Sequence, residues 1–368
     1  MKKMTNAASR LVEEIQRQIP NLKSVIQKQI NKLHKASANV LICGPTGVGK
    51  STIINKVFRE RIATTGVGKP VSKNITKYSN RCVPIRLFDT PGFEIGNNDI
   101  MNSILDFISV TKKKKDPSEH VHIMWYCVSG PGSRFQPSEI DFLNRALKHL
   151  PVIIVVTNSG QDPSESNKLA KHISGKSSKL KYVLQTSANS GLNLDRLITA
   201  TKELIPEAFR NSLINAQIVN LKEKERATEK WLYHYVTSAA ITGMSPIPFS
   251  DWVALVPVQL TMMAHIAIVY GLNINMELLK PLVTWTFATG GASVAGRFIA
   301  NMLKLIPGLG TLLGGVINAA VAGSITLAMG KAYIKVLSWA INSTVKGDDL
   351  TDAEVRKLMR EEFAEARQ

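Results

Sequence analysis

Residues 44–51, Gly44-Pro45-Thr46-Gly47-Val48-Gly49-Lys50-Ser51, decide what the first half of this 368-residue chain can be. A glycine, four residues, Gly-Lys and a serine form the spacing of phosphate-binding loops. An apolar run, Val40–Cys43, precedes the loop and a helical pattern follows it, so backbone N–H groups and a helix N-terminus would converge on one anion. The expected phosphate loop comprises Gly44, Pro45, Thr46, Gly47, Val48, Gly49, Lys50, Ser51 and Thr52. Lys50 would contact the terminal phosphates, and the Ser51 hydroxyl would ligate Mg²⁺.

Short apolar runs alternate with polar helical stretches from about residue 39 to residue 205. The five runs are Val40–Cys43, Ile85–Phe88, Val121–Cys127, Val152–Val156 and Tyr182–Leu184. Strands that alternate with helices predict an α/β fold, with a mostly parallel sheet and helices on both faces. Ligands of such sheets bind beyond the carboxyl ends of the strands, where the phosphate loop lies.

A second motif, Asp89-Thr90-Pro91-Gly92, follows the run that ends at Phe88. A carboxylate there can hold Mg²⁺ through water, and the Gly92 N–H can sense a terminal phosphate. With the phosphate loop, this motif resembles the P-loop GTPases of the Era- and TrmE-like translation-factor branch. The spacing is also similar to that of septins, chloroplast import receptors and immunity-associated GTPases. The resemblance covers about residues 38 to 205.

The resemblance implies further contacts to nucleotide and metal. A hydroxyl of the first switch would complete the Mg²⁺ shell, and the local match suggests Ser72, with Thr76 as the alternative. Members of this group read guanine with Asn or Thr, Lys, any residue and Asp after the fifth strand. Here Thr157 and Asn158 begin that segment, the Lys is missing, and the nearest carboxylate, Asp162, comes two places late. The last family motif matches Ser187, Ala188 and Asn189 and favours GTP over ATP.

The catalytic residues implied by the resemblance are Lys50, Ser51, Asp89 and Gly92. Hydrolysis needs a water held in line with the terminal phosphate. The residue after the second motif is Phe93, which cannot orient a water. We therefore expect slow GTP hydrolysis that self-association through the GTPase domain, or another partner, stimulates. Arg134 is either a loop cation or an arginine finger across a dimer, and Lys112–Lys115 is either a solvated loop or a binding site.

Residues 228–343 resemble the helical domain of unknown function that follows Era-like modules in bacterial, often membrane-associated, proteins. The resemblance rests on Pro246–Trp252, Gln259–Met263, Tyr270-Gly271 and Ile306–Gly310. Two runs in this region, Trp252–Leu272 and Leu305–Gly330, contain no charged residue and exceed the roughly 18 residues of a membrane-span candidate. A buried helical hairpin in a soluble domain would look similar. Whether these helices span, lie on or avoid a bilayer stays open at this point.

The charge balance also indicates an anionic partner. The chain has 46 Lys and Arg against 28 Asp and Glu, a formal net charge of +18. Nucleotide phosphates and an anionic membrane surface both fit, and ribosomal RNA fits less well because only 6% of the residues are aromatic. Three scattered cysteines exclude a disulfide framework and favour buried thiols in a reducing cytoplasm.

The expected domain organisation has four parts. They are an amphipathic helical segment at 1–37, a P-loop GTPase domain at 38–206, a hydrophobic all-α domain at 207–345 and a C-terminal amphipathic helix at 346–368. The function expected from the whole sequence is a GTP-hydrolysing switch or remodelling factor at the cytoplasmic face of a membrane. The alternatives are a soluble Era-like factor that binds ribosomal RNA and a nucleotide-binding scaffold with negligible hydrolysis.

Overall fold

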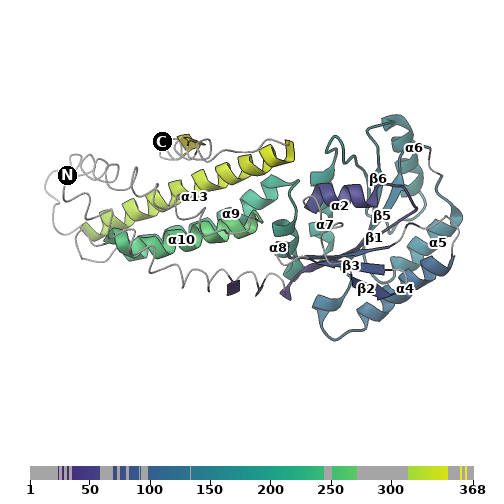
Figure 1. Ribbon diagram of the computed structural model, residues 1–368, viewed down its shortest axis with the longest axis horizontal. Helices are drawn as coiled ribbons and strands as arrows, with labels where there is room; N and C mark the ends of the chain where they lie inside the picture. Colours follow the sequence, from purple (N-terminus) through teal and green to yellow (C-terminus); the bar gives the residue numbers. More distant parts are fainter. Residues whose placement is uncertain are drawn as a thin grey trace. The chain divides into compact units, whose positions relative to one another are not determined.

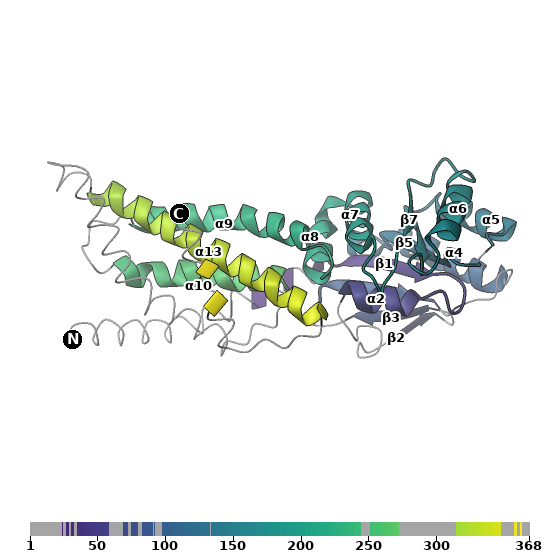
Figure 2. The same cartoon turned by 90° about the horizontal axis from the view of Figure 1, so that it is seen from above.

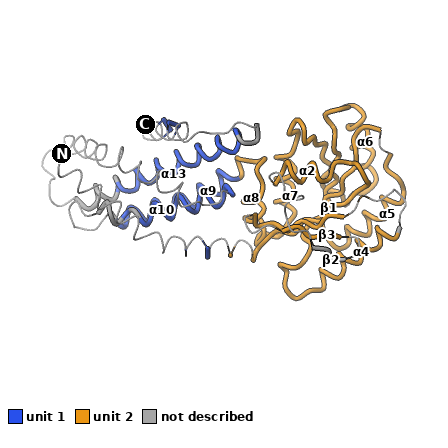
Figure 3. The backbone as a smooth tube through the Cα atoms, in the orientation of Figure 1, with its two compact units in different colours: residues 1–30, 224–368 blue, residues 31–223 orange. Residues whose placement is uncertain are grey.

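The chain divides into two compact units, residues 31–223 and residues 1–30 with 224–368 (Figure 3). The computed structural model describes residues 24, 27–28, 31–32, 35–58, 69–72, 75–79, 83–90, 92, 98–132, 134–243, 251–271, 314–346, 357–358 and 361–362. The expected amphipathic helices near the two chain ends lie almost wholly outside these residues, as does Phe93.

The first unit contains a seven-stranded sheet in the order β2-β3-β4-β1-β5-β6-β7. Its strands are β1 (Ala38–Cys43), β2 (Lys69–Ser72), β3 (Ile75–Ser79), β4 (Ile85–Asp89), β5 (Ile123–Ser129), β6 (Val152–Thr157) and β7 (Tyr182–Gln185). The pairs β4–β1, β1–β5, β5–β6 and β6–β7 are parallel. This confirms the predicted mostly parallel sheet, and each of the five predicted apolar runs contributes a strand.

The sequence did not reveal the hairpin β2–β3, which adds two antiparallel strands at the β4 edge. Of β3, only Ile75 is fully buried, and the pairing with β2 is irregular between Pro70 and Ser72. Strand β3 buries so little apolar surface that its sequence shows neither a continuous apolar run nor a clean alternation of apolar and polar residues.

Helices cover both faces of the sheet (Figures 1 and 2). One face packs on α2 (Lys50–Phe58), α7 (Leu194–Leu204) and α8 (Glu207–Ala216). The other packs on α4 (Asn98–Lys112), α5 (Pro137–Ala146) and α6 (Pro163–Ser174). Strands β1, β5 and β6 are buried along nearly their whole length, which is why they read as unbroken apolar runs.

A short 3₁₀ helix, η1 (Pro117–Glu119), is tied to the sheet by His122. The Nδ1 atom of His122 accepts the backbone N–H of Asn39 at 3.0 Å, so Nε2 carries the proton that it donates to the Pro117 carbonyl, also at 3.0 Å. The ring stacks on Phe209 of α8 with 3.8 Å between centroids. His122 thus joins η1, β1 and α8 as a neutral, buried imidazole.

The second unit contains α9 (Leu221–Gly243, whose first three residues belong to the first unit), α10 (Asp251–Val269) and α13 (Gly314–Lys346). The three helices run alongside one another in both views (Figures 1 and 2). The predicted all-α character of this region is confirmed. Within the described part of the chain, no helix is long and apolar enough to cross a membrane.

Two glycines and a buried lysine show how these helices pack. A Cβ added at Gly330 of α13 would lie 2.2 Å from the Leu232 side chain of α9, whereas one at Gly323 would meet its nearest neighbour, Val236, at 3.6 Å. Lys224 of α9 is fully buried, and its ammonium donates to the Val269 carbonyl at the end of α10 at 2.7 Å. The lysine therefore caps the α10 C-terminus, where the helix dipole favours a cation.

Candidate functional site

The phosphate loop connects β1 to α2 in a conformation that requires its glycines. Gly44 has φ +141°, and a Cβ there would lie 2.1 Å from the Cys127 carbonyl oxygen of β5. Gly47 and Gly49 also have left-handed backbones, with φ +78° and +90°. Only glycine reaches these conformations without strain. The exposed loop tip, Thr46 and Gly47, and the exposed Ser51 and Thr52 at the α2 N-terminus can reach a ligand.

Lys50 is folded back into this loop. Its ammonium donates to the carbonyl oxygens of Gly44 and Pro45, at 2.9 Å each, and the side chain is buried. The cation is therefore held at the centre of the loop, beside the backbone N–H groups that begin α2. A cation and a helix N-terminus at one place form an anion site.

The second motif lies against the phosphate loop. A Cβ at Gly92 would be 2.4 Å from both Cα and Oγ1 of Thr46, so the Gly92 backbone packs directly on the loop tip. The Thr90 N–H donates to the Ile42 carbonyl at 3.1 Å, which fixes the start of the motif beside β1. The structure thus places Gly92 against the same loop that holds Lys50, and the sequence singled out these two residues separately.

Asp89 ends β4 in a partly buried position. Burial raises the pKa of its carboxyl to about 6, although the nearby Lys50 and the Thr90 N–H both lower it. Among the described residues, its Oδ1 atom is buried and has no hydrogen-bond partner. Thr76 of β3 is the direct cross-strand neighbour of Asp89, whereas Ser72 pairs with Ile75 at the hairpin tip. A bound cation would stabilise the charged form of this partly buried carboxylate.

The third part of the site begins at Thr157, where β6 ends. The Thr157 hydroxyl lies 2.5 Å from the Val48 carbonyl of the phosphate loop and 3.0 Å from the Val128 carbonyl of β5. Asn158 follows with a left-handed backbone, φ 53°. Its Oδ1 atom is 3.8 Å from where a Gly49 Cβ would be. Thr157 and Asn158 therefore adjoin the phosphate loop.

The loop that follows β7 lies beside this segment. The Ser159 N–H donates to the Thr186 carbonyl at 3.0 Å, and a Cβ at Gly160 would be 3.2 Å from Oγ of Ser187 and 3.7 Å from Oγ of Ser190. Ser187 is buried, Ala188 packs against the core, and Asn189 is exposed. The sequence did not single out Ser190, because a lone loop serine carries no signal of its own.

Asp162 has a structural partner. Its Oδ1 atom accepts the Glu165 N–H at 2.9 Å, which makes Asp162 the N-cap of α6. The sequence contained this signal, since Asp followed by Pro opens many helices. The base-reading role expected of Asp162 stays a prediction.

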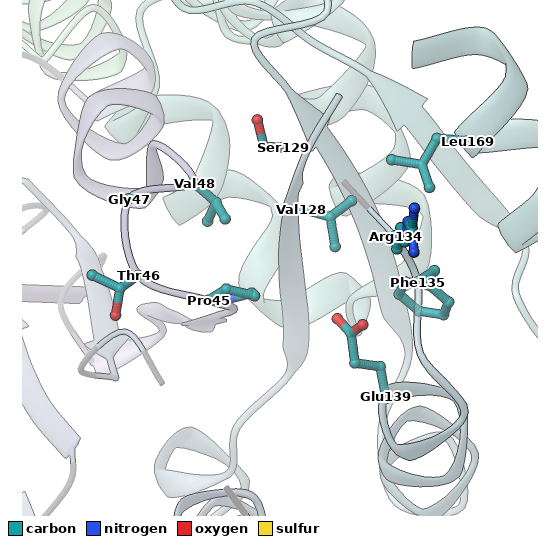
Figure 4. Close-up of a pocket in the computed structure, with 10 residues that line it drawn as sticks. All are labelled: Pro45, Thr46, Gly47, Val48, Val128, Ser129, Arg134, Phe135, Glu139 and Leu169. Carbon is teal, nitrogen blue, oxygen red and sulfur yellow. The ribbon is translucent and has the colours of Figure 1, made fainter. Parts of the chain in front are cut away.

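A pocket of about 200 Å³ adjoins the phosphate loop on its α5 side (Figure 4). Pro45 and Thr46 line one side, and Arg134 and Phe135 line the other. Glu139 also lines it, with its carboxylate accepting the Tyr126 hydroxyl at 2.7 Å and the Gln136 N–H at 2.9 Å. Burial raises the pKa of Glu139. Only the capping-box spacing from Gln136 marks Glu139 in the sequence.

The thiols near the loop are buried, as expected. Burial raises the pKa of Cys127 to about 12 and raises that of Cys43 well above its usual value. Thiols with raised pKa values are poor nucleophiles at neutral pH. Cys43 and Cys127 therefore act as core packing residues.

Two family models match the chain. Residues 39–158 match the family described as "50S ribosome-binding GTPase", and residues 213–363 match "Domain of unknown function (DUF697)". The first match contains the phosphate loop and the second motif. The second match begins in α8 and includes α9, α10 and α13.

Several known proteins are similar to part of the chain. Septin-9 of Rattus norvegicus is 28% identical over 148 residues, 33% of this chain and 26% of the septin. Magnetosome membrane protein 22 of Magnetospirillum gryphiswaldense is 30% identical over 114 residues, 30% of this chain and 58% of that protein. The chain thus matches about a quarter of the septin's length and less than two thirds of the magnetosome protein's.

Solved structures of GTP-binding proteins are also similar. A probable GTP-binding protein engB aligns with 46% of this chain and 100% of its own, at 20% identity and a TM-score of 0.35. Era of Aquifex aeolicus, solved with GDP and AlF₄⁻, aligns with 46% of this chain and 57% of its own, at 20% identity and a TM-score of 0.31. Residues 39–158 are thus similar to a GTPase family and residues 213–363 to a domain of unknown function, and the phosphate loop and the second motif lie within the first of these matches.

Proposed function

We propose that this protein binds GTP at the phosphate loop and hydrolyses it slowly to GDP and phosphate. The observation that carries the proposal is the convergence at Thr46: Lys50 lies inside the loop, and the Gly92 backbone packs on its tip. A terminal phosphate bound there would meet a cation, a helix N-terminus and the second motif together. Lys50, Ser51, Asp89 and Gly92 are the proposed catalytic residues.

The same site suits Mg²⁺. Oδ1 of Asp89 is buried without a hydrogen-bond partner among the described atoms, and Ser51 is exposed at the start of α2. Hard oxygen ligands of this kind are those that Mg²⁺ prefers. Ser51 and Asp89 would hold the ion, with Ser72 as the proposed switch ligand and Thr76 as the alternative. When bound, Mg²⁺ neutralises charge on the phosphates.

A phosphate-release assay tests the reaction. The wild-type chain should turn over GTP on the order of 10⁻² s⁻¹ or slower, because Phe93 does not position the water. Ser51→Ala should lower the rate by about a hundredfold. Lys56→Ala, in the last turn of the same helix, is the matched control and should keep the wild-type rate. Turnover at tens per second by the isolated monomer, or an unchanged rate in Ser51→Ala, would refute this mechanism.

We further propose that the protein acts as a nucleotide-dependent switch or remodelling factor on an anionic membrane at the cytoplasmic face. The similarity to a protein named for the magnetosome membrane and the net charge of +18 support this role. Helix α9 also exposes Trp231, Tyr233 and Ile241, side chains that suit a membrane interface. Stimulation by a homodimer of GTPase domains belongs to the same proposal.

Flotation with vesicles tests the membrane role. The full chain should float with phosphatidylserine-containing vesicles and not with neutral ones, and Tyr233→Ser with Ile241→Ser should reduce the bound fraction. The pair Thr237→Ser and Lys222→Arg, on the same helix, is the control and should bind as the wild type does. Binding to ribosomal RNA without flotation in any nucleotide state would favour the soluble alternative. Nucleotide binding without measurable hydrolysis would favour the scaffold alternative.

A further inference from the structure

Two loops meet beside the phosphate loop, residues 157–162 and residues 186–191, called here the base loops. Thr157 anchors the first loop to the phosphate loop through its hydrogen bond to the Val48 carbonyl. The Ser159 N–H anchors the same loop to the second one through the Thr186 carbonyl. A base attached to a nucleotide in the phosphate loop would therefore meet the segment between these two anchors.

The middle of that segment is Gly160, and its neighbours are hydroxyls. A Cβ at this position would lie 3.2 Å from Oγ of Ser187 and 3.7 Å from Oγ of Ser190. The other side chains of the two base loops ahead of Asp162 are hydroxyls, amides and one alanine: Thr157, Asn158, Ser159, Gln161, Thr186, Ala188 and Asn189. The groups that flank Gly160 are thus neutral.

The carboxylate of Asp162 is directed to α6. Its Oδ1 atom accepts the Glu165 N–H at 2.9 Å, and its carbonyl accepts the Ser166 hydroxyl at 2.7 Å and the Ser166 N–H at 3.1 Å. An N-cap carboxylate that leaves its helix gives up a charge-assisted hydrogen bond. The Asp162 carboxylate is therefore already engaged at the start of α6.

We propose that the base is read by neutral hydroxyls, those of Ser187 and Ser190 beside Gly160, so that the site binds purine nucleoside triphosphates with little regard to the group at purine C2. This inference rests on the proposed nucleotide binding and specifies its selectivity. A hydroxyl can donate or accept, so it can pair with the 2-amino group of GTP or the 2-carbonyl of XTP, and it can rotate to another partner when ITP offers only a hydrogen at C2. A carboxylate only accepts, so it would select the 2-amino group.

The size of the preference for GTP over ITP distinguishes base recognition by hydroxyls from base recognition by a carboxylate. A hydrogen bond to a carboxylate corresponds to a preference of about tenfold or more, whereas one between neutral groups corresponds to about threefold. We expect GTP and ITP to displace a fluorescent GDP analogue from the full chain with affinities within about threefold, and XTP within about tenfold of GTP.

Asp162→Asn isolates the carboxylate without unfolding α6, because Asn is as good an N-cap as Asp. The variant should change the affinities for GTP, ITP and XTP by less than about twofold each, leaving their ratios as in the wild type. A preference for GTP over ITP of tenfold or more in the wild type, lost or turned toward XTP in Asp162→Asn, would overturn the inference while leaving nucleotide binding intact. Failure of all three triphosphates to bind would instead refute the proposed function itself.

A variant designed to gain selectivity for GTP over ITP provides a second test. Gly160 does not have a left-handed backbone, so it can accept a side chain, and Ser187→Ala removes the close Oγ atom. Gly160→Asp combined with Ser187→Ala should create a preference for GTP over ITP of about tenfold. Ser187→Ala alone is the matched control and should show no such preference. A folded double variant that still binds GTP and ITP equally would show that Gly160 does not face the base.

Discussion

Asp89 is the residue whose protonation links the stability of the folded chain to the proposed Mg²⁺ site. Its pKa is about 6 in the folded chain and near 3.8 when exposed, so the folded state binds more protons between these values. The free energy of unfolding contributed by Asp89 therefore falls as pH rises from about 4 to 6, by about 2 to 3 kcal/mol. Asp89→Asn, which stays neutral, should become more stable than the wild type by that amount at pH 7 and no more stable at pH 4.

Urea unfolding of both proteins at several pH values, without nucleotide or Mg²⁺, measures this difference. The same variant should lose Mg²⁺-dependent tight binding of GTP, since the orphaned Oδ1 atom is the proposed link to the ion. An Asp89→Asn protein that is less stable than the wild type at pH 7 would show that the buried Asp89 carboxylate does not destabilise the fold when nucleotide and Mg²⁺ are absent.

At this scale the sequence predicted the phosphate loop well, because glycine spacing and a Gly-Lys-Ser ending have few other uses. The base-reading role expected of Asp162 stays a prediction, and spacing alone did not show that this residue also begins a helix. The structure uses that carboxylate to cap α6. Capping depends on where a helix starts, and a carboxylate near a binding loop looks the same in the sequence whichever neighbour it serves.

Among the elements, η1 is joined to the sheet by a histidine that must stay neutral. Burial lowers the pKa of His122 to about 4, below the usual 6.5. The folded state therefore binds fewer protons between these values, and the stability that His122 contributes is complete above about pH 6.5 and lost as pH falls toward 4. The expected loss is about 3 kcal/mol.

His122→Asn keeps an acceptor for the Asn39 N–H and has no group that titrates in this range. The difference in the free energy of unfolding between wild type and variant should therefore be largest at pH 7 and shrink toward pH 4. Because Asp89 and His122 act in opposite directions, their two contributions to the pH dependence of the wild-type protein should largely cancel between pH 4 and 6. A difference that does not depend on pH would contradict the assignment of a neutral His122.

The contact between α9 and α13 makes a second prediction at this scale. Gly330→Ala places a methyl group 2.2 Å from the buried Leu232 side chain and should lower the free energy of unfolding by about 1 to 3 kcal/mol. Gly323→Ala, in the same helix, meets Val236 at an ordinary 3.6 Å and should be neutral or stabilising by up to about 1 kcal/mol. Thermal unfolding of both variants checks this, and equal effects would mean that α9 and α13 do not pack as described.

The elements that the sequence predicted are those whose burial leaves a pattern. Strands β1, β5 and β6 are enclosed between helices and so are almost wholly apolar. The hairpin β2–β3 forms by pairing with the β4 edge, and such backbone pairing leaves no trace in residue type. The α10 run looked long enough to span a bilayer, yet Gln259 uses its amide to bind the Thr326 hydroxyl of α13 at 3.1 Å. Polar groups buried between helices were not distinguishable in the sequence from interruptions of a membrane span.

At the scale of the whole molecule, the division into two units predicts two responses to nucleotide. A ligand stabilises the unit that binds it by about 2.7 kcal/mol at a hundred times its dissociation constant. GTP with Mg²⁺ should therefore raise the unfolding temperature of residues 31–223 by about 5 to 10 °C and leave the transition of the helical unit unchanged. Differential scanning calorimetry of the full chain resolves the two unfolding transitions. Gly330→Ala should lower the unfolding temperature of the helical unit alone. A single transition that shifts as one with GTP would mean that the units unfold cooperatively.

The lysine that lies inside the phosphate loop has a kinetic consequence. Lys50 already holds the carbonyls of Gly44 and Pro45 in place, so the loop is shaped when the chain folds and not when the ligand arrives. Encounter with a nucleotide should then need little rearrangement of the loop, and capture of the phosphates should approach the rate of diffusion. Differences in affinity among variants of the base loops should accordingly appear as differences in residence time, with association rates that stay nearly constant.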